Sequence, residues 1–95
     1  MRVEWKATAR NDLAEAVAWI ARENPRAAIR VYAEVMRQVE RLGRHPQSGR
    51  PGRIKDTREL VINRTPYIVP YQVGQSAVVV LRVLHGARRW PDAPE

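Results

Sequence analysis

The residues with the greatest chemical potential lie near the end of the chain. Arg82, His85, Arg88 and Arg89 follow one another closely, and Trp90 comes directly after them. Histidine transfers protons near neutral pH, arginine holds a phosphate through two parallel hydrogen bonds, and tryptophan stacks on a base. Together these side chains favour a phosphate-bearing or nucleic-acid ligand. A structural role is equally open, with His85 bonded to a backbone carbonyl and Arg82 paired with a carboxylate.

Several other kinds of chemistry have no support in the sequence. The chain has no cysteine, which excludes disulfides, thiol catalysis and zinc sites built on thiolates. The two histidines, His45 and His85, belong to no set with metal-ligand spacing. No Lys-Ser/Thr pair follows the glycines of the central loop, and no nucleophile elbow surrounds Ser48 or Ser76. We therefore expect neither a metal nor a cofactor.

Positive charge is concentrated in the second half of the chain. The sequence has 17 Lys and Arg against 10 Asp and Glu, a net charge of +7. Residues 1–40 carry a net charge of +1, residues 41–90 carry +8 and the last five residues carry −2. A one-sided basic surface attracts polyanions, either nucleic acid or an acidic protein. An arginine-rich proteome would produce the same excess without any such partner.

The first half of the chain has the pattern of one short strand and two helices. Residues 2–5 alternate as a strand does. Thr8 is a candidate N-cap for a first helix, in which apolar residues recur on one face up to position 21. Asn24 and Pro25 then provide a cap and a first helical residue for a second helix, which Gly43 ends. So short a link predicts an antiparallel helical hairpin.

The second half predicts three strands after a loop at residues 43–53 that is rich in glycine and proline. The strands are expected at residues 58–62, 67–73 and 77–84, with a tight turn at 74–76. Pro70 falls inside the second strand and indicates a bulge or a missing N–H there. The expected fold is α+β: one domain over residues 1–95, with a helical hairpin packed on a small antiparallel sheet in the order β-α-α-β-β-β.

The sequence also predicts where the protein acts. It has no apolar run of the roughly 18–20 residues that a membrane helix needs, and residues 1–6 lack the apolar stretch of a secretory signal. We therefore expect a cytoplasmic protein with no membrane partner.

Several motifs together resemble the ParE/RelE superfamily of type II toxins. They are Gly49-Arg50-Pro51-Gly52 and the segments 57–62, 66–71 and 81–90, together with the Asn24-Pro25 break between the two helices. The resemblance covers residues 5 to 90. It implies the toxin of a toxin–antitoxin module, neutralised by an acidic antitoxin that wraps it. It also implies that operator DNA is bound only through the complex with that antitoxin.

The superfamily has two activities, and the resemblance separates them position by position. RelE-type members cut mRNA on the ribosome, whereas ParE-type members poison DNA gyrase. The two lysines of the RelE-type strand fall here on Glu59 and Val61, and the arginine after the first tyrosine of the next strand falls on Ile68. Arg88 does match a RelE-type arginine, but Pro94 stands where the late tyrosine would be. The resemblance therefore implies a ParE-like inhibitor of gyrase that is not itself an enzyme.

Two alternatives remain. The first is a ribosome-dependent mRNA endonuclease in which Glu59 is the base, His85 the acid and Arg88 the clamp on the phosphate. RNA scission needs such groups, because a base must activate the 2′-hydroxyl and positive charge must stabilise the transition state. The second alternative is a binding module with no toxicity of its own.

Contacts with the partners are assigned from charge and exposure. The residues expected to contact the target are the basic side chains of the second half, namely Arg58, Arg64, Arg82, His85, Arg88 and Arg89. Trp19 lies about 120° from the centre of the apolar face of its helix, so it should be partly exposed. It is the expected anchor for an apolar side of the antitoxin. Its other possible role is to cover the edge of the core.

Overall fold

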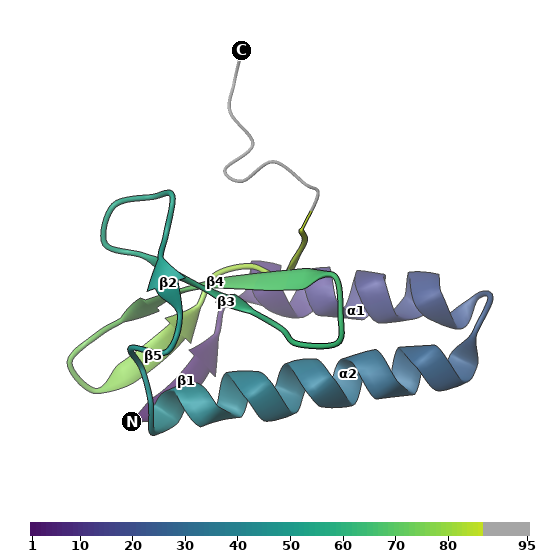
Figure 1. The fold of residues 1–95 in the computed structure, drawn as a ribbon, viewed down its shortest axis with the longest axis horizontal. Helices are drawn as coiled ribbons and strands as arrows, with labels where there is room; N and C mark the ends of the chain where they lie inside the picture. Colours follow the sequence, from purple (N-terminus) through teal and green to yellow (C-terminus); the bar gives the residue numbers. More distant parts are fainter. Residues whose placement is uncertain (87–95) are drawn as a thin grey trace, which may run out of the picture.

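The computed structural model describes residues 1–86 of the chain. The elements are β1 (Arg2–Trp5), α1 (Ala7–Ala21), α2 (Pro25–Glu40), a 3-10 turn (Arg41–Gly43), β2 (Arg50–Pro51), β3 (Arg58–Val61), β4 (Tyr67–Val73), β5 (Ala77–Val80) and β6 (Leu84–His85). Figure 1 shows α1 and α2 running side by side as a hairpin, with the sheet over the end where α2 finishes. The α+β class and the order of the long elements agree with the sequence prediction.

The sheet is mixed, which corrects the prediction of a purely antiparallel one. Its strand order is β1-β5-β4-β3-β2, and β6 pairs with β4 beside the end of β5. β1 runs parallel to β5, whereas the other pairs are antiparallel. The cause is the connection: the helical hairpin follows β1 and lets it join the free edge of β5 in either direction, whereas a tight turn would enforce an antiparallel pair. The short strand β2 was also not predicted.

The helical hairpin and the inner face of the sheet enclose the core. Val35 and Val39 of α2 and Leu13 of α1 pack against Val69 of β4 and Val80 of β5, all of them buried. Tyr32 of α2 is 48% exposed, in contrast to these buried side chains. The cap predicted for α2 is also confirmed, because the backbone N–H of Ala27 donates to Asn24 Oδ1 at 3.1 Å.

A bulge divides the third predicted strand, residues 77–84, into β5 and β6. Tyr71 pairs with Val80 and Ile68 pairs with Leu84, so three residues, 81–83, lie opposite two residues of β4, 69–70. One of the two opposing residues is Pro70, which has no N–H to offer and accepts instead from the backbone N–H of Leu81 at 2.9 Å. The bulge expected from this proline is therefore present.

Helix α1 binds this bulge through two side chains one helical turn apart. The Asp12 carboxylate accepts from Arg82 Nε at 2.7 Å, from Arg82 Nη2 at 3.1 Å and from the backbone N–H of Val83 at 3.0 Å. The Thr8 hydroxyl donates to the carbonyl of Leu81 at 3.2 Å. The N-cap role predicted for Thr8 is wrong, because α1 already begins at Ala7 and the Thr8 side chain bonds across to the sheet.

We predict that Asp12→Ala lowers the free energy of unfolding by about 2–3 kcal/mol. The substitution removes the acceptor of two hydrogen bonds from Arg82 and of one from the backbone N–H of Val83, and the loss of such bonds at a partly buried site is costly. Urea denaturation measures the change. Arg82→Ala should cost less, because the carboxylate keeps its bond to Val83.

The matched control is Glu4→Ala, which removes the carboxylate of the ion pair between Arg2 and Glu4. That pair is exposed, with side chains 67% and 50% accessible, so its loss should cost less than about 1 kcal/mol. An Asp12→Ala variant no less stable than Glu4→Ala would show that the bulge does not depend on the carboxylate.

Candidate functional site

The cluster at the end of the chain is only partly within the described residues. Arg82 forms its bidentate ion pair with Asp12, and its side chain is 24% exposed. His85 is exposed on β6, and its ring meets the ring of Tyr67 edge-on, with centroids 5.8 Å apart and an interplanar angle of 78°. Arg88 and Arg89 lie outside the described residues. The structure thus places Arg82 against α1 and His85 at the outer end of the sheet.

Glu59 lies inside the fold, although it belongs to the strand next to the sheet edge. Its side chain is 1% exposed. Its carboxylate accepts from the Arg50 side chain at 3.3 Å and from the backbone N–H of Arg53 at 3.0 Å, and Arg53 Nε lies 3.5 Å away. Two guanidinium groups therefore balance this buried charge. The interaction closes the loop that leads from β2 into β3.

Arg58 and Arg64, two of the expected target contacts, hold parts of the fold together. Arg58 Nη1 donates to the carbonyl of Gly49 at 2.6 Å. Arg64 donates to Glu34 Oε2 through Nε at 3.2 Å and Nη2 at 3.1 Å, which ties the β3–β4 turn to α2. Hydrogen bonds from Arg37, Gln38 and Arg64 lower the pKa of Glu34 to about 2, with Arg37 the largest cause. Arg64 remains 67% exposed despite this pair.

The helical hairpin carries the most exposed apolar side chains. Trp19 is 67% exposed, in agreement with the prediction, and the Arg22 guanidinium lies 5.1 Å from the centre of its ring. An apolar groove of about 580 Å³ runs between α1 and α2. It is lined by Trp5, Arg10, Leu13, Ala14, Val17, Ala18, Tyr32 and Met36. The small alanines of α1 leave this space open beside the larger side chains of α2.

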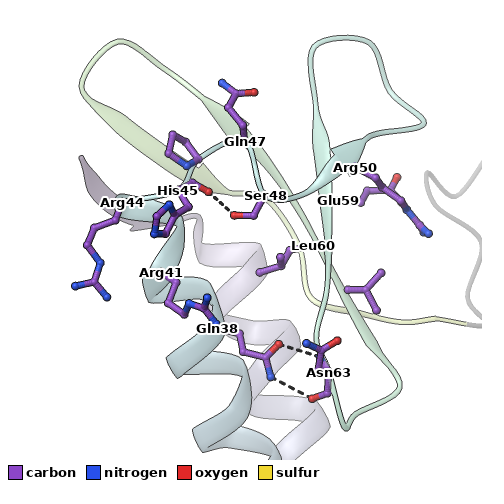
Figure 2. Close-up of a pocket in the computed structure, with 12 residues that line it drawn as sticks. Gln38, Arg41, Arg44, His45, Gln47, Ser48, Arg50, Glu59, Leu60 and Asn63 are labelled. Carbon is purple, nitrogen blue, oxygen red and sulfur yellow. Dashed lines mark hydrogen bonds and ion pairs between the residues drawn. The ribbon is translucent and has the colours of Figure 1, made fainter.

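A second cavity, about 920 Å³ in volume, lies between the end of α2 and the edge of β3 (Figure 2). We call it the basic cleft. Its charged lining residues are Arg41, Arg44, Arg50 and Glu59, and the others are Gln38, His45, Pro46, Gln47, Ser48, Leu60, Val61 and Asn63. Sequence reasoning did not select these basic residues. The signal that could have found them is the density of arginine on both sides of the turn at residues 45–49.

The Tyr71 side chain fixes the loop that forms the upper wall of the basic cleft. Its buried hydroxyl donates to the carbonyl of Pro46 at 2.7 Å and accepts from the backbone N–H of Gly49 at 2.8 Å. A Cβ at Gly49 would lie 2.6 Å from the Tyr71 ring, so only glycine allows so close an approach. Burial raises the pKa of Tyr71, which keeps this hydroxyl protonated and able to donate.

Residues 1–86 contain no group of three or more His, Cys, Asp or Glu side chains arranged to hold a metal ion. Over the same part of the chain, no helix has the length and apolar character needed to cross a membrane.

Comparison with known proteins shows the family. Residues 3–90 match the model of the ParE toxin of the type II toxin–antitoxin system parDE. The chain is 44% identical over 91 residues to "Putative toxin Y4kP" of Sinorhizobium fredii, covering 96% of this chain and 94% of that one. It is 32% identical over 89 residues to the toxin RelE3 of Caulobacter vibrioides, covering 92% and 96% of the two chains.

Two solved structures share the fold. A chain of the chromosomal ParDE toxin–antitoxin system from P. aeruginosa superimposes with a TM-score of 0.82 at 24% identity, covering 90% of this chain and 95% of that chain. A chain of the RelBE2 toxin–antitoxin complex from Mycobacterium tuberculosis superimposes with a TM-score of 0.63 at 28% identity, covering 92% of each. The family model spans nearly the whole chain and the relatives align from end to end, so this protein belongs to the ParE family of type II toxins.

Proposed function

We propose that this toxin acts in the cytoplasm by inhibiting DNA gyrase, without catalysing a reaction itself, and that a cognate acidic antitoxin neutralises it. The ParE family and the RelE-type nucleases share one fold, so the fold does not separate the two activities. The separation must come from the residues that a nuclease would need.

The observation that carries the proposal is the environment of Glu59. The nuclease alternative assigns this carboxylate as the base that takes a proton from the 2′-hydroxyl of RNA. A general base must come within hydrogen-bond reach of that proton. Glu59 is 1% exposed, and both of its oxygens already accept hydrogen bonds, one from Arg50 and one from Arg53. An RNA strand could reach it only after these contacts break and the loop moves.

The neighbouring positions support the same conclusion. Val61 and Ile68 stand where the resemblance places basic residues of the nuclease type, and they face each other across β3 and β4. An apolar cross-strand pair supplies no charge to a transition state. Each lost group of that kind typically costs about 10²–10³ in rate, so losses at several positions leave little catalysis.

An antitoxin partner is supported from two sides. The solved relatives come from toxin–antitoxin systems, by their descriptions. On this chain, Trp19 and the groove between α1 and α2 present apolar surface, while the net charge of +7 attracts an acidic partner. A partner that combines apolar and acidic residues matches both features.

One prediction tests whether the target of the toxin is gyrase. The purified chain, freed of antitoxin, should inhibit supercoiling by gyrase or accumulate gyrase-linked DNA breaks, and it should leave mRNA on stalled ribosomes uncut. Arg88→Ala should reduce the gyrase effect without unfolding the protein, which circular dichroism would check. Inhibition should persist in Glu59→Gln, since Glu59 acts neither as a catalyst nor as a target contact in this proposal.

The opposite result is equally clear. Codon-specific cuts in ribosome-bound mRNA that disappear in His85→Ala would replace this proposal with the nuclease alternative. A chain that affects neither gyrase nor mRNA, although it folds and binds its antitoxin, would point to the binding module.

A separate prediction concerns the antitoxin. Trp19→Ala should weaken antitoxin binding by about 1–3 kcal/mol, because exposed aromatic side chains often supply much of the binding energy at an interface. Isothermal titration calorimetry measures the affinity, and a thermal melt of the free toxin measures its stability. Val61→Ala is the control, since Val61 is also an exposed apolar residue, at 47%, but lies on β3.

Two outcomes would assign Trp19 a structural role instead. One is a large fall in melting temperature with unchanged affinity. The other is an equal loss of affinity in Trp19→Ala and Val61→Ala, which would show that the effect is not specific to the helical hairpin.

A further inference from the structure

The basic cleft brings three arginines and a histidine to one concave surface. Arg41, Arg44 and His45 line it from the end of α2 and the following turn, and Arg50 lines it from β2. Glu59 is the one carboxylate in the lining, and it is turned toward Arg50 and Arg53. A concave surface lined by one sign of charge concentrates ions of the opposite sign.

Two of these arginines differ from the arginines that hold the fold together. Arg58, Arg64 and Arg82 each bond to a carboxylate or a backbone carbonyl. Within residues 1–86, the Arg41 and Arg44 guanidinium groups make no ion pair with a carboxylate, and both residues are exposed. Figure 2 shows Arg41 directed into the space beside Gln38 and Arg44 extending outward from the turn. Both are available to an anion that approaches the cleft.

The edge of β3 that borders the cleft is nearly closed to an added peptide strand. β2 pairs with Arg58 and Glu59. The Gln38 amide takes the place of a strand at Asn63: its Oε1 accepts from the Asn63 N–H at 2.9 Å, and its Nε2 donates to the Asn63 carbonyl at 3.1 Å. Because alternate residues of a strand face its edge, this leaves Val61 as the unpaired position. One position is too few for strand addition, so a ligand here is held by its charges.

We propose that the basic cleft binds the phosphodiester backbone of a nucleic acid. Guanidinium groups match the geometry of a phosphate and form two parallel hydrogen bonds with it. The lining has no Trp, Tyr or Phe on which bases would stack, so contact is with the backbone and is independent of sequence. This contact is made by the toxin chain itself, apart from any operator binding through the antitoxin, and it goes beyond the inhibition of gyrase.

The test is fluorescence anisotropy of labelled nucleic acid with the purified full-length chain across a salt series. The ligands are a DNA duplex, an RNA duplex of the same sequence, and polyglutamate as an acidic polypeptide. The double variant Arg41→Gln/Arg44→Gln should bind the duplex about tenfold or more weakly. The negative slope of log K against log salt should become less steep by about 2, since each neutralised phosphate contributes about 0.9 to its magnitude.

The matched control is Arg26→Gln/Arg30→Gln, which removes the same amount of charge from the first part of α2, where both residues are exposed. It should keep the slope and most of the affinity. The ligand for which the difference between the two variants is larger, DNA or RNA, identifies the source of the phosphates.

Three results would overturn the proposal: no binding of either duplex, equal losses in the two double variants, or a loss confined to polyglutamate. The last would make the cleft a site for an acidic polypeptide. Circular dichroism of both variants establishes that they remain folded. Because the assay contains neither gyrase nor ribosomes, its outcome is independent of the target proposed above.

Discussion

The hydrogen bonds of the Asp12 carboxylate hold the bulge of the sheet against helix α1. Pro70 removes a hydrogen-bond donor from the middle of β4, and the opposing chain bulges out of register at residues 81–83. A bulge leaves backbone groups without ladder partners. The Asp12 carboxylate accepts a hydrogen bond from the Val83 N–H that the bulge exposes, and Arg82 balances the charge of this carboxylate. The Asp12 carboxylate on helix α1 thus completes the hydrogen bonding of a bulge that lies opposite Pro70, 58 positions later in the sequence (70 minus 12).

Other arginines also connect separate elements of the fold through specific acceptors. A net charge of +7 suggests a broad basic surface, but several arginines are bonded to specific acceptors within the fold. Arg58 fixes the Gly49 carbonyl, Arg64 joins a turn to α2 through Glu34, and Arg82 joins the bulge to α1. Exposed ion pairs contribute little to stability, so the position of each pair decides its importance. Arg41 and Arg44, at the end of α2 and in the turn that follows, are both exposed and make no ion pair with a carboxylate within residues 1–86.

The parts of the fold that local rules determine could be predicted, and the parts that depend on distant contacts could not. Helix α2 follows from the Asn24 cap and from Pro25 as its first residue, and the bulge follows from Pro70. The parallel pairing of β1 with β5 depends on residues more than 70 positions apart in sequence, which no local pattern encodes. Thr8 illustrates the limit well. Its side chain is of a type favoured at an N-cap, yet its hydroxyl donates to the carbonyl of Leu81 on the bulge.

The candidate site shows the same division. The exposure of Trp19 followed from helical geometry, whereas the anionic ligand expected at the end of the chain stays a prediction. The burial of Glu59 could not be foreseen, because it depends on how the loop from β2 folds back over β3. That burial has a consequence for how the two activities of the superfamily are separated. A lysine in place of Glu59, as in the nuclease type, would put a third cation at a buried position beside Arg50 and Arg53. Uncompensated charges of one sign are too costly to bury, so the loop would have to open or the two arginines would have to change. A change from one activity to the other therefore requires rebuilding the loop as well as replacing single residues.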